Sequence, residues 1–185
     1  MKKSSIIILA PILFTVTICK AQSTGTTNFK SEKFSKTATI SLNGKIEKVF
    51  PLFGAFEERK WAEEWNPTLI YPATETIEEG TTFKTPGHGH NEAQFLWRVT
   101  KYDAAAHLVQ YLVSSENRDW TITVKCSSLN GDKTRAEITY IFIGLNNTGN
   151  MLNEHMLGII YKHNLKDWEE AINYYLEKGS LKPNQ

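Results

Sequence analysis

Cysteine and recognised catalytic motifs are both scarce in this chain of 185 residues. Cys19 and Cys126 are the two cysteines. The sequence contains no Gly-x-Ser-x-Gly elbow, phosphate loop, dinucleotide-binding glycine motif, His-Glu-x-x-His or Cys-x-x-Cys. These absences exclude the common motif-defined enzyme classes and indicate no cofactor. They do not exclude catalysis by residues without a known signature.

A long apolar run occurs at the N-terminus. Lys2 and Lys3 precede the uncharged segment 6–18, and Cys19 and Ala21 provide the small side chains that signal peptidase requires. We therefore predict a signal peptide, residues 1–21, cut after Ala21, and a periplasmic or secreted protein. The run is shorter than the ~20 residues of a spanning helix. A retained anchor and a lipoprotein acylated at Cys19 are the alternatives, although Ile18 is large for a lipoprotein signal.

A charge excess of either sign is also absent. The chain has 21 Lys and Arg residues and 20 Asp and Glu residues. Removal of residues 1–21 removes three lysines and no acid, which leaves 18 basic and 20 acidic residues. Such a balance lacks the basic surface typical of nucleic-acid binding, so we expect no nucleic-acid partner and no stable membrane insertion after cleavage. The one remaining cysteine, Cys126, allows no internal disulfide, and we expect it to be a small buried hydrophobe.

The rest of the chain reads as one domain preceded by a flexible tether, residues 22–33. A first strand is predicted over 37–42, followed by a short helix bent at Pro51 and a second short helix over 56–65. Period-two alternation and turn signals then predict an antiparallel series of strands. These strands lie near 68–71, 81–85, 94–99, 107–113, 120–126 and 138–143.

A helical stripe of apolar residues follows Gly144. It predicts a single helix of nearly thirty residues that ends at Gly179. The stripe consists of Leu152, Met156, Ile159, Ile160, Trp168, Ile172, Tyr175 and Leu176. A sheet with one apolar face needs a cover, and this helix is long enough to provide it. The fold class is therefore α+β, with a curved antiparallel sheet of about six to seven strands around a long C-terminal helix.

Several segments, in their order, resemble the helix-grip superfamily, also called SRPBCC or START-like and related to polyketide cyclases. They are Ile40–Gly44 with Ile46–Phe53, the Trp61–Pro67 segment, Gly80 with Phe83, Trp97 with Tyr102-Asp103, and Trp168–Leu176 with Gly179. The resemblance covers residues 34–179 and leaves 180–185 as a tail. It implies a deep cavity between the sheet and the helix. It does not imply one activity, because members include lipid carriers, hormone receptors and cyclases.

Six aromatic side chains are our candidates for the lining of such a cavity: Trp61, Trp65, Trp97, Trp120, Tyr140 and Phe142. Aromatic rings give large contact areas at low entropic cost, although a filled core uses the same residues. His155 and Ile159 are further candidates for ligand contact on the helix. His155 or His163 could act as an acid or base, with Tyr140 as a possible donor.

Other polar residues have weaker claims to a site. His88, His90 and Glu92 are possible metal ligands, but a polar hairpin tip explains them as well, and we expect no metal. Alternation places Arg98 and Lys125 on the outer face of the sheet. Glu57, Glu58, Glu63 and Glu64 are expected on the solvated face of the second helix.

The sequence thus predicts an exported protein that binds a small hydrophobic or amphipathic ligand. The alternative is a cyclase, dehydratase or hydrolase that uses a cavity histidine. A filled domain that acts through its surface is a third interpretation.

Overall fold

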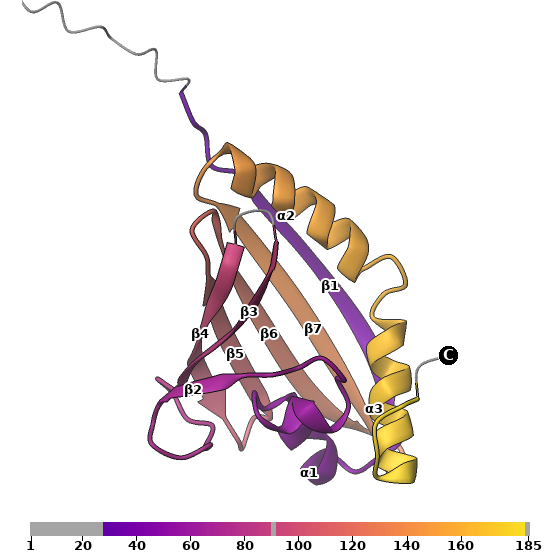
Figure 1. Ribbon diagram of the computed structural model, residues 1–185. Coiled ribbons are helices and arrows are strands. Elements are labelled where there is room, and N and C mark those ends of the chain that lie inside the picture. The colour runs from indigo at the N-terminus through magenta and orange to yellow at the C-terminus, as the bar shows by residue number, and fades with distance from the viewer. Residues whose placement is uncertain (1–27, 90–91, 184–185) are drawn as a thin grey trace, which may run out of the picture.

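The computed structural model describes residues 28–89 and 92–183, and its centre is one antiparallel sheet of seven strands. The strand order is β1-β7-β6-β5-β4-β3-β2, so strands consecutive from β2 to β7 are neighbours and β1 joins the far edge beside β7. The sheet is curved, and the helices lie on its concave side (Figure 1). The strands are β1 Lys33–Leu42, β2 Thr68–Tyr71, β3 Thr82–Gly89, β4 Glu92–Asp103, β5 Leu108–Ser114, β6 Arg118–Leu129 and β7 Lys133–Gly144.

The alternating sequence pattern explains the sheet. On β6, the buried residues Trp120, Ile122, Val124 and Cys126 alternate with side chains on the outer face. On β7, Ile138, Tyr140 and Phe142 are buried in the same way. Every predicted strand is present, and most are longer than the sequence pattern indicated. The predicted signal segment and the first half of the tether, residues 22–27, lie outside the described residues; Lys33, the last tether residue, begins β1.

Two short helical segments connect β1 to β2, as predicted. The helix α1, Ile46–Val49, continues at Pro51 into the 3-10 turn η1, Phe50–Phe53. A second 3-10 turn, η2, spans Glu57–Lys60. The apolar side chains of α1 and η1 are buried, so this segment closes one end of the curved sheet.

The predicted long C-terminal helix is two helices, α2 (Asn147–Ile160) and α3 (Lys166–Lys178). Asn164 and Leu165 adopt left-handed conformations, with φ of 51° and 57°, and this interrupts the helix. Tyr161 anchors the break: its hydroxyl lies 2.8 Å from the Lys36 carbonyl oxygen and accepts the Tyr140 backbone N–H at 3.2 Å. Leu165 is also fully buried, so tertiary contacts on β1 and β7 compensate for the strained backbone.

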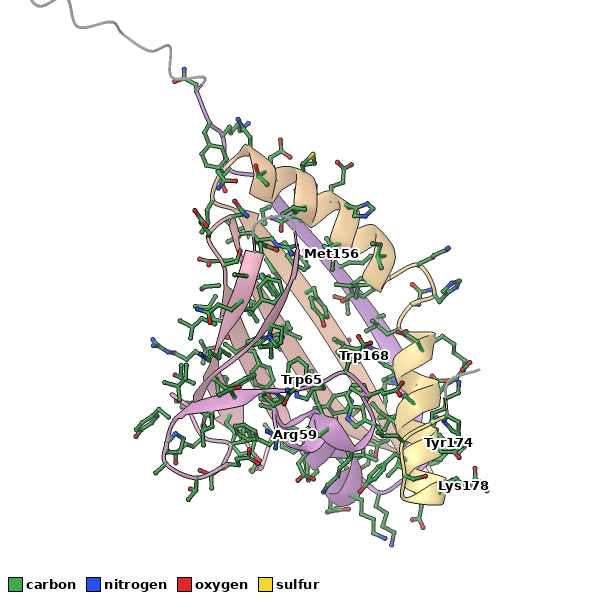
Figure 2. The ribbon with its side chains drawn as sticks, viewed as in Figure 1. Arg59, Trp65, Met156, Trp168, Tyr174 and Lys178 are labelled. Atoms are coloured by element: carbon green, nitrogen blue, oxygen red, sulfur yellow. The ribbon has the colours of Figure 1, made fainter. Side chains whose placement is uncertain are left out.

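The two helices cover different parts of the sheet. α2 packs against β7 and β1, whereas α3 packs against β1. Met156 on α2 and Trp168 on α3 lie on the inner sides of their helices (Figure 2). None of the helices within residues 28–89 and 92–183 is long and apolar enough to cross a membrane.

Candidate functional site

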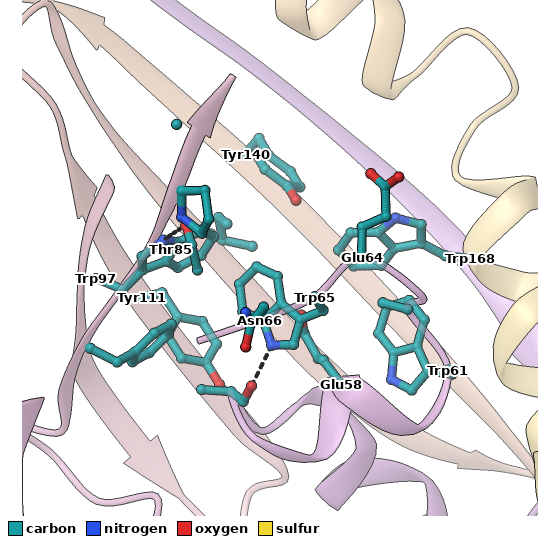
Figure 3. A pocket seen from close by; sticks show the side chains of 16 residues that line it. Glu58, Trp61, Glu64, Trp65, Asn66, Thr85, Trp97, Tyr111, Tyr140 and Trp168 are labelled. Carbon is teal, nitrogen blue, oxygen red and sulfur yellow. Dashed lines mark hydrogen bonds between the residues drawn. The ribbon is translucent and has the colours of Figure 1, made fainter. Parts of the chain in front are cut away.

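A cavity of about 550 Å³ lies between the concave face of the sheet, the η2 segment and α3. Its walls are mainly aromatic, with a few polar side chains near η2 (Figure 3). The principal lining residues are Glu58, Trp61, Glu64, Trp65, Asn66, Phe83, Thr85, Trp97, Tyr111, Ile122, Tyr140 and Trp168. The space between sheet and helices that the resemblance implied therefore exists, and it is not filled by side chains.

Hydrogen bonds fix the orientation of three of the four tryptophans in the wall. Trp61 Nε1 donates to the Leu52 carbonyl at 2.7 Å, and Trp65 Nε1 donates to the Ala55 carbonyl. Trp97 Nε1 donates to Thr85 Oγ1 at 3.0 Å. Because the protein satisfies the N–H groups of these three indoles, their rings present an apolar surface to the cavity.

Glu58 is a cavity residue, and the prediction that it lies on a solvated face is wrong. It lies on η2, and Ala55, Trp61 and Ala62, which flank η2 in the sequence, line the same cavity. The side chain is partly exposed to the cavity, but protein surrounds it. This burial raises the pKa of the Glu58 carboxyl well above its ordinary value. The pKa values of Tyr111 and Tyr140 are raised first by burial and then by the Glu58 charge.

We predict that Glu58→Gln stabilises the protein increasingly as pH rises. The unfolded carboxyl ionises near pH 4.5, but the folded one resists ionisation, so the wild type loses stability as pH rises from that value through the folded pKa. The variant carries no such penalty. Urea unfolding between pH 4 and pH 9 should give equal stabilities at the acid end and diverging ones above it. Glu63→Gln, at an exposed position, is the control, and a parallel response of both variants would contradict the prediction.

A second chamber of about 210 Å³ adjoins this cavity beneath α2. We call it the inner chamber and the cavity of about 550 Å³ the outer chamber. The two share Trp65, Trp97, Ile122 and Tyr140 as wall residues. The inner chamber is completed by Phe95, Arg118, Trp120, Phe142, Met156 and Ile160. Arg118 is thus a cation in an otherwise aromatic and aliphatic chamber.

Glu92 holds Arg118 in place. Arg118 Nε donates to Glu92 Oε1 at 2.9 Å, and Arg118 Nη2 donates to Glu92 Oε2 at 2.6 Å. Ser115 Oγ also donates to Glu92 Oε1, at 2.6 Å. Both charged side chains are almost fully buried, with exposures of 3% for Arg118 and 1% for Glu92. The pair is bidentate, which is the strongest geometry for such an interaction.

All six aromatic candidates border one of the two chambers. Trp61 lines the outer one, Trp120 and Phe142 line the inner one, and Trp65, Trp97 and Tyr140 line both. Their contact with a ligand stays a prediction.

The helix candidates lie elsewhere. His155 and His163 are exposed, and the Ile159 side chain is 55% exposed. The apolar stripe expected on this helix was wider than the face that meets the cavity. Met156 and Ile160, four residues apart, face the inner chamber, whereas His155 and Ile159, each one residue earlier in the chain, lie on the outward side. His163 falls in the break between α2 and α3.

The possible metal ligands are not assembled in the described part of the chain. Glu92 is bonded to Arg118 and Ser115, so its oxygens are engaged. His90 and the side chain of His88 lie outside what the structure describes. Among the described residues, no group of three or more His, Cys, Asp or Glu side chains is placed to hold a metal ion.

The sequence contained signals for the two polar groups that we overlooked. Arg118 continues the inward series Trp120, Ile122, Val124 by period two, and Glu58, on η2, precedes the cavity residue Trp61 by three positions. Two other expectations are met, because Arg98 and Lys125 are exposed and Cys126 is buried. Burial raises the pKa of the Cys126 thiol to about 12, which makes it a poor nucleophile.

The curved sheet, the helical cover and the cavity between them define the helix-grip class of folds, which confirms the predicted fold. No family model and no curated protein matches the sequence. The comparison with solved structures is therefore the one that relates this chain to other proteins.

Three of these solved structures illustrate the similarity. Norcoclaurine synthase from Thalictrum flavum has a TM-score of 0.61 and 9% identity, with 80% of this chain and 96% of that chain covered. The Zhui aromatase/cyclase from Streptomyces sp. R1128 has a TM-score of 0.61 and 11% identity, with 80% and 95% covered. Ara h 8.0201 has a TM-score of 0.55 and 12% identity, with 80% and 99% covered. At these identities the similarity establishes the fold alone.

Proposed function

We propose that this protein binds a small hydrophobic or amphipathic molecule in the cavity between the sheet and the C-terminal helices. The aromatic cavity itself carries the proposal: the N–H groups of Trp61, Trp65 and Trp97 are satisfied by the protein, and the wall is mostly ring surface. An enclosed apolar space with a few placed polar groups is typical of small-molecule sites. A structure of norcoclaurine synthase, which shares the fold, holds dopamine and hydroxybenzaldehyde.

A cavity-filling substitution tests the binding function. We expect Ala62→Trp to place an indole in the outer chamber and to weaken ligand binding at least about tenfold, because the ligand and the new ring compete for one space. Native mass spectrometry of gently purified protein identifies what is bound, and titration of that compound gives the affinity. Ala105→Trp, on the exposed β4–β5 turn, is the control. A wild-type protein that is empty and also ignores a panel of lipids and aromatic compounds would contradict the proposal.

We also propose export, with removal of residues 1–21. The basic start, the apolar run and the small residues at positions 19 and 21 support it. N-terminal sequencing of the cellular protein should begin at Gln22. An intact Met1 in the membrane fraction would instead support the anchor, and an acylated Cys19 would support the lipoprotein.

A catalytic function would have to use other residues than the histidines that the sequence suggested. His155 and His163 are exposed, so the cavity histidine of the cyclase, dehydratase or hydrolase alternative is absent from the chambers described above. Glu58 and Tyr140 are cavity side chains with raised pKa values, and each suits hydrogen bonding to a ligand in its neutral form. Binding therefore accounts for the geometry with fewer assumptions than catalysis.

A further inference from the structure

Arg118 has one nitrogen that the neighbouring protein does not use. Nε and Nη2 are bonded to Glu92, but Nη1 is buried without a hydrogen-bond partner among the described residues. A buried donor without an acceptor costs stability, and charged donors cost more than neutral ones. The guanidinium therefore has an open position for an acceptor atom.

The surroundings of Arg118 point that position toward a ligand. The guanidinium carbon lies 5.0 Å from the ring centre of Trp120, 5.8 Å from that of Phe142 and 5.9 Å from that of Phe95. Met156 and Ile160 of α2 cover the same chamber. None of these five side chains offers an oxygen. The Tyr140 hydroxyl also borders the chamber but is not hydrogen-bonded to Nη1 in the described structure, so the position is open to an acceptor on a molecule in the chamber.

The charge balance of the chamber determines which acceptor fits. Glu92 neutralises Arg118 through two hydrogen bonds, so the buried pair has no net charge. A ligand carboxylate would add an uncompensated negative charge to an apolar chamber, and that has a large desolvation cost. A carbonyl or phenol oxygen accepts the same hydrogen bond without this cost.

We propose that Arg118 Nη1 binds an uncharged acceptor oxygen, so that the ligand is a neutral aromatic ketone, aldehyde or phenol and not an aromatic acid. The inference rests on the proposed binding function and narrows it to a ligand class. It also assigns the inner chamber as the subsite that distinguishes ligands with such an oxygen from plain hydrocarbons.

Three probes with one ring system separate shape from hydrogen bonding. They are 2-acetylnaphthalene, its hydrocarbon isostere 2-isopropenylnaphthalene, and 2-naphthoate. Affinities are measured by quenching of tryptophan fluorescence and by calorimetry. In the wild type we expect 2-acetylnaphthalene to bind about tenfold more tightly than the isostere, the effect of one hydrogen bond to a charged donor, and 2-naphthoate to bind more weakly than both.

Two variants test the assignment to Arg118. The double variant Arg118→Met/Glu92→Met replaces the pair by apolar side chains and should remove the preference for the ketone over the isostere. Glu92→Gln leaves the Arg118 charge uncompensated and should reverse the order, with 2-naphthoate becoming the tightest of the three. Thermal unfolding with and without each probe gives a second readout of the same order.

The outcomes distinguish this inference from the proposed function. If the ketone and the isostere bind the wild type equally, or 2-naphthoate binds it most tightly, the protein is a binder but the role of Arg118 is wrong. The same holds if the double variant keeps the preference for the ketone. If none of the three probes binds, the binding function itself is contradicted for this class of molecule, and the inference fails with it.

Discussion

Arg118→Met is expected to destabilise the protein by about 3–5 kcal/mol, whereas Arg118→Met/Glu92→Met should remain close to the wild type. The single change leaves the Glu92 carboxylate buried, with a 1% exposed side chain and without its cation. The double change removes both charges and lets methionine side chains pack against Phe95 and Trp120. Urea unfolding monitored by tryptophan fluorescence measures both.

The control for this comparison is Arg98→Met. Arg98 lies on β4 with an exposed side chain, so its replacement should change stability by no more than about 0.5 kcal/mol. If the single and double Arg118 variants are destabilised equally, packing and not the uncompensated charge determines the loss. If neither is destabilised, the pair does not form as described.

Phe83→Ala is expected to lower the free energy of unfolding by about 3–5 kcal/mol, because it removes a buried ring from the centre of the aromatic cluster. Phe83 is fully buried, stacks on Trp97 at 5.5 Å, and meets Trp65 and Tyr111 edge to face at 6.2 Å. The volume that the ring occupied becomes part of the outer chamber. Saturating toluene should therefore restore part of the stability, by filling an apolar space that water occupies poorly.

Leu96→Ala provides the comparison on the adjacent strand. Leu96 is 44% exposed on the outer face of β4, so it should have little effect, and toluene should not rescue it. A small loss for Phe83→Ala, or one that toluene leaves unchanged, would mean that the cluster collapses into the space instead of leaving a cavity.

The sheet was predictable because each long strand has one buried face. Trp120, Ile122 and Val124 alternate with partly exposed residues, and this period is local and visible in the sequence. The break at Asn164 and Leu165 was not predictable, because helix propensity continues through the segment. The break is maintained by contacts distant in sequence, chiefly those of the Tyr161 hydroxyl with the carbonyl oxygens of Lys36 and Ile138.

The candidate site also has features that the sequence predicts and features that it does not. Its aromatic wall follows from alternation, and Arg118 follows from the same alternation once a charged residue is allowed on the inner face. Glu92 does not follow from it. Glu92 and Phe95 are both buried although they are three residues apart on β4, which departs from period-two alternation, and the pairing of β3 with β4 shifts register close by, between Pro86 and Gly89. A register irregularity depends on both strands and leaves little trace in either sequence.

The break between α2 and α3 divides the cover of the cavity between two separate structural units. Met156 and Ile160 of α2 close the inner chamber, and Trp168 of α3 closes the outer one. Between them, Tyr161 fastens the chain to β1 and β7. A substitution in one helix can therefore alter one chamber while the other keeps its shape. A protein built in this way can exchange one half of its ligand for another during evolution without redesigning the whole cavity.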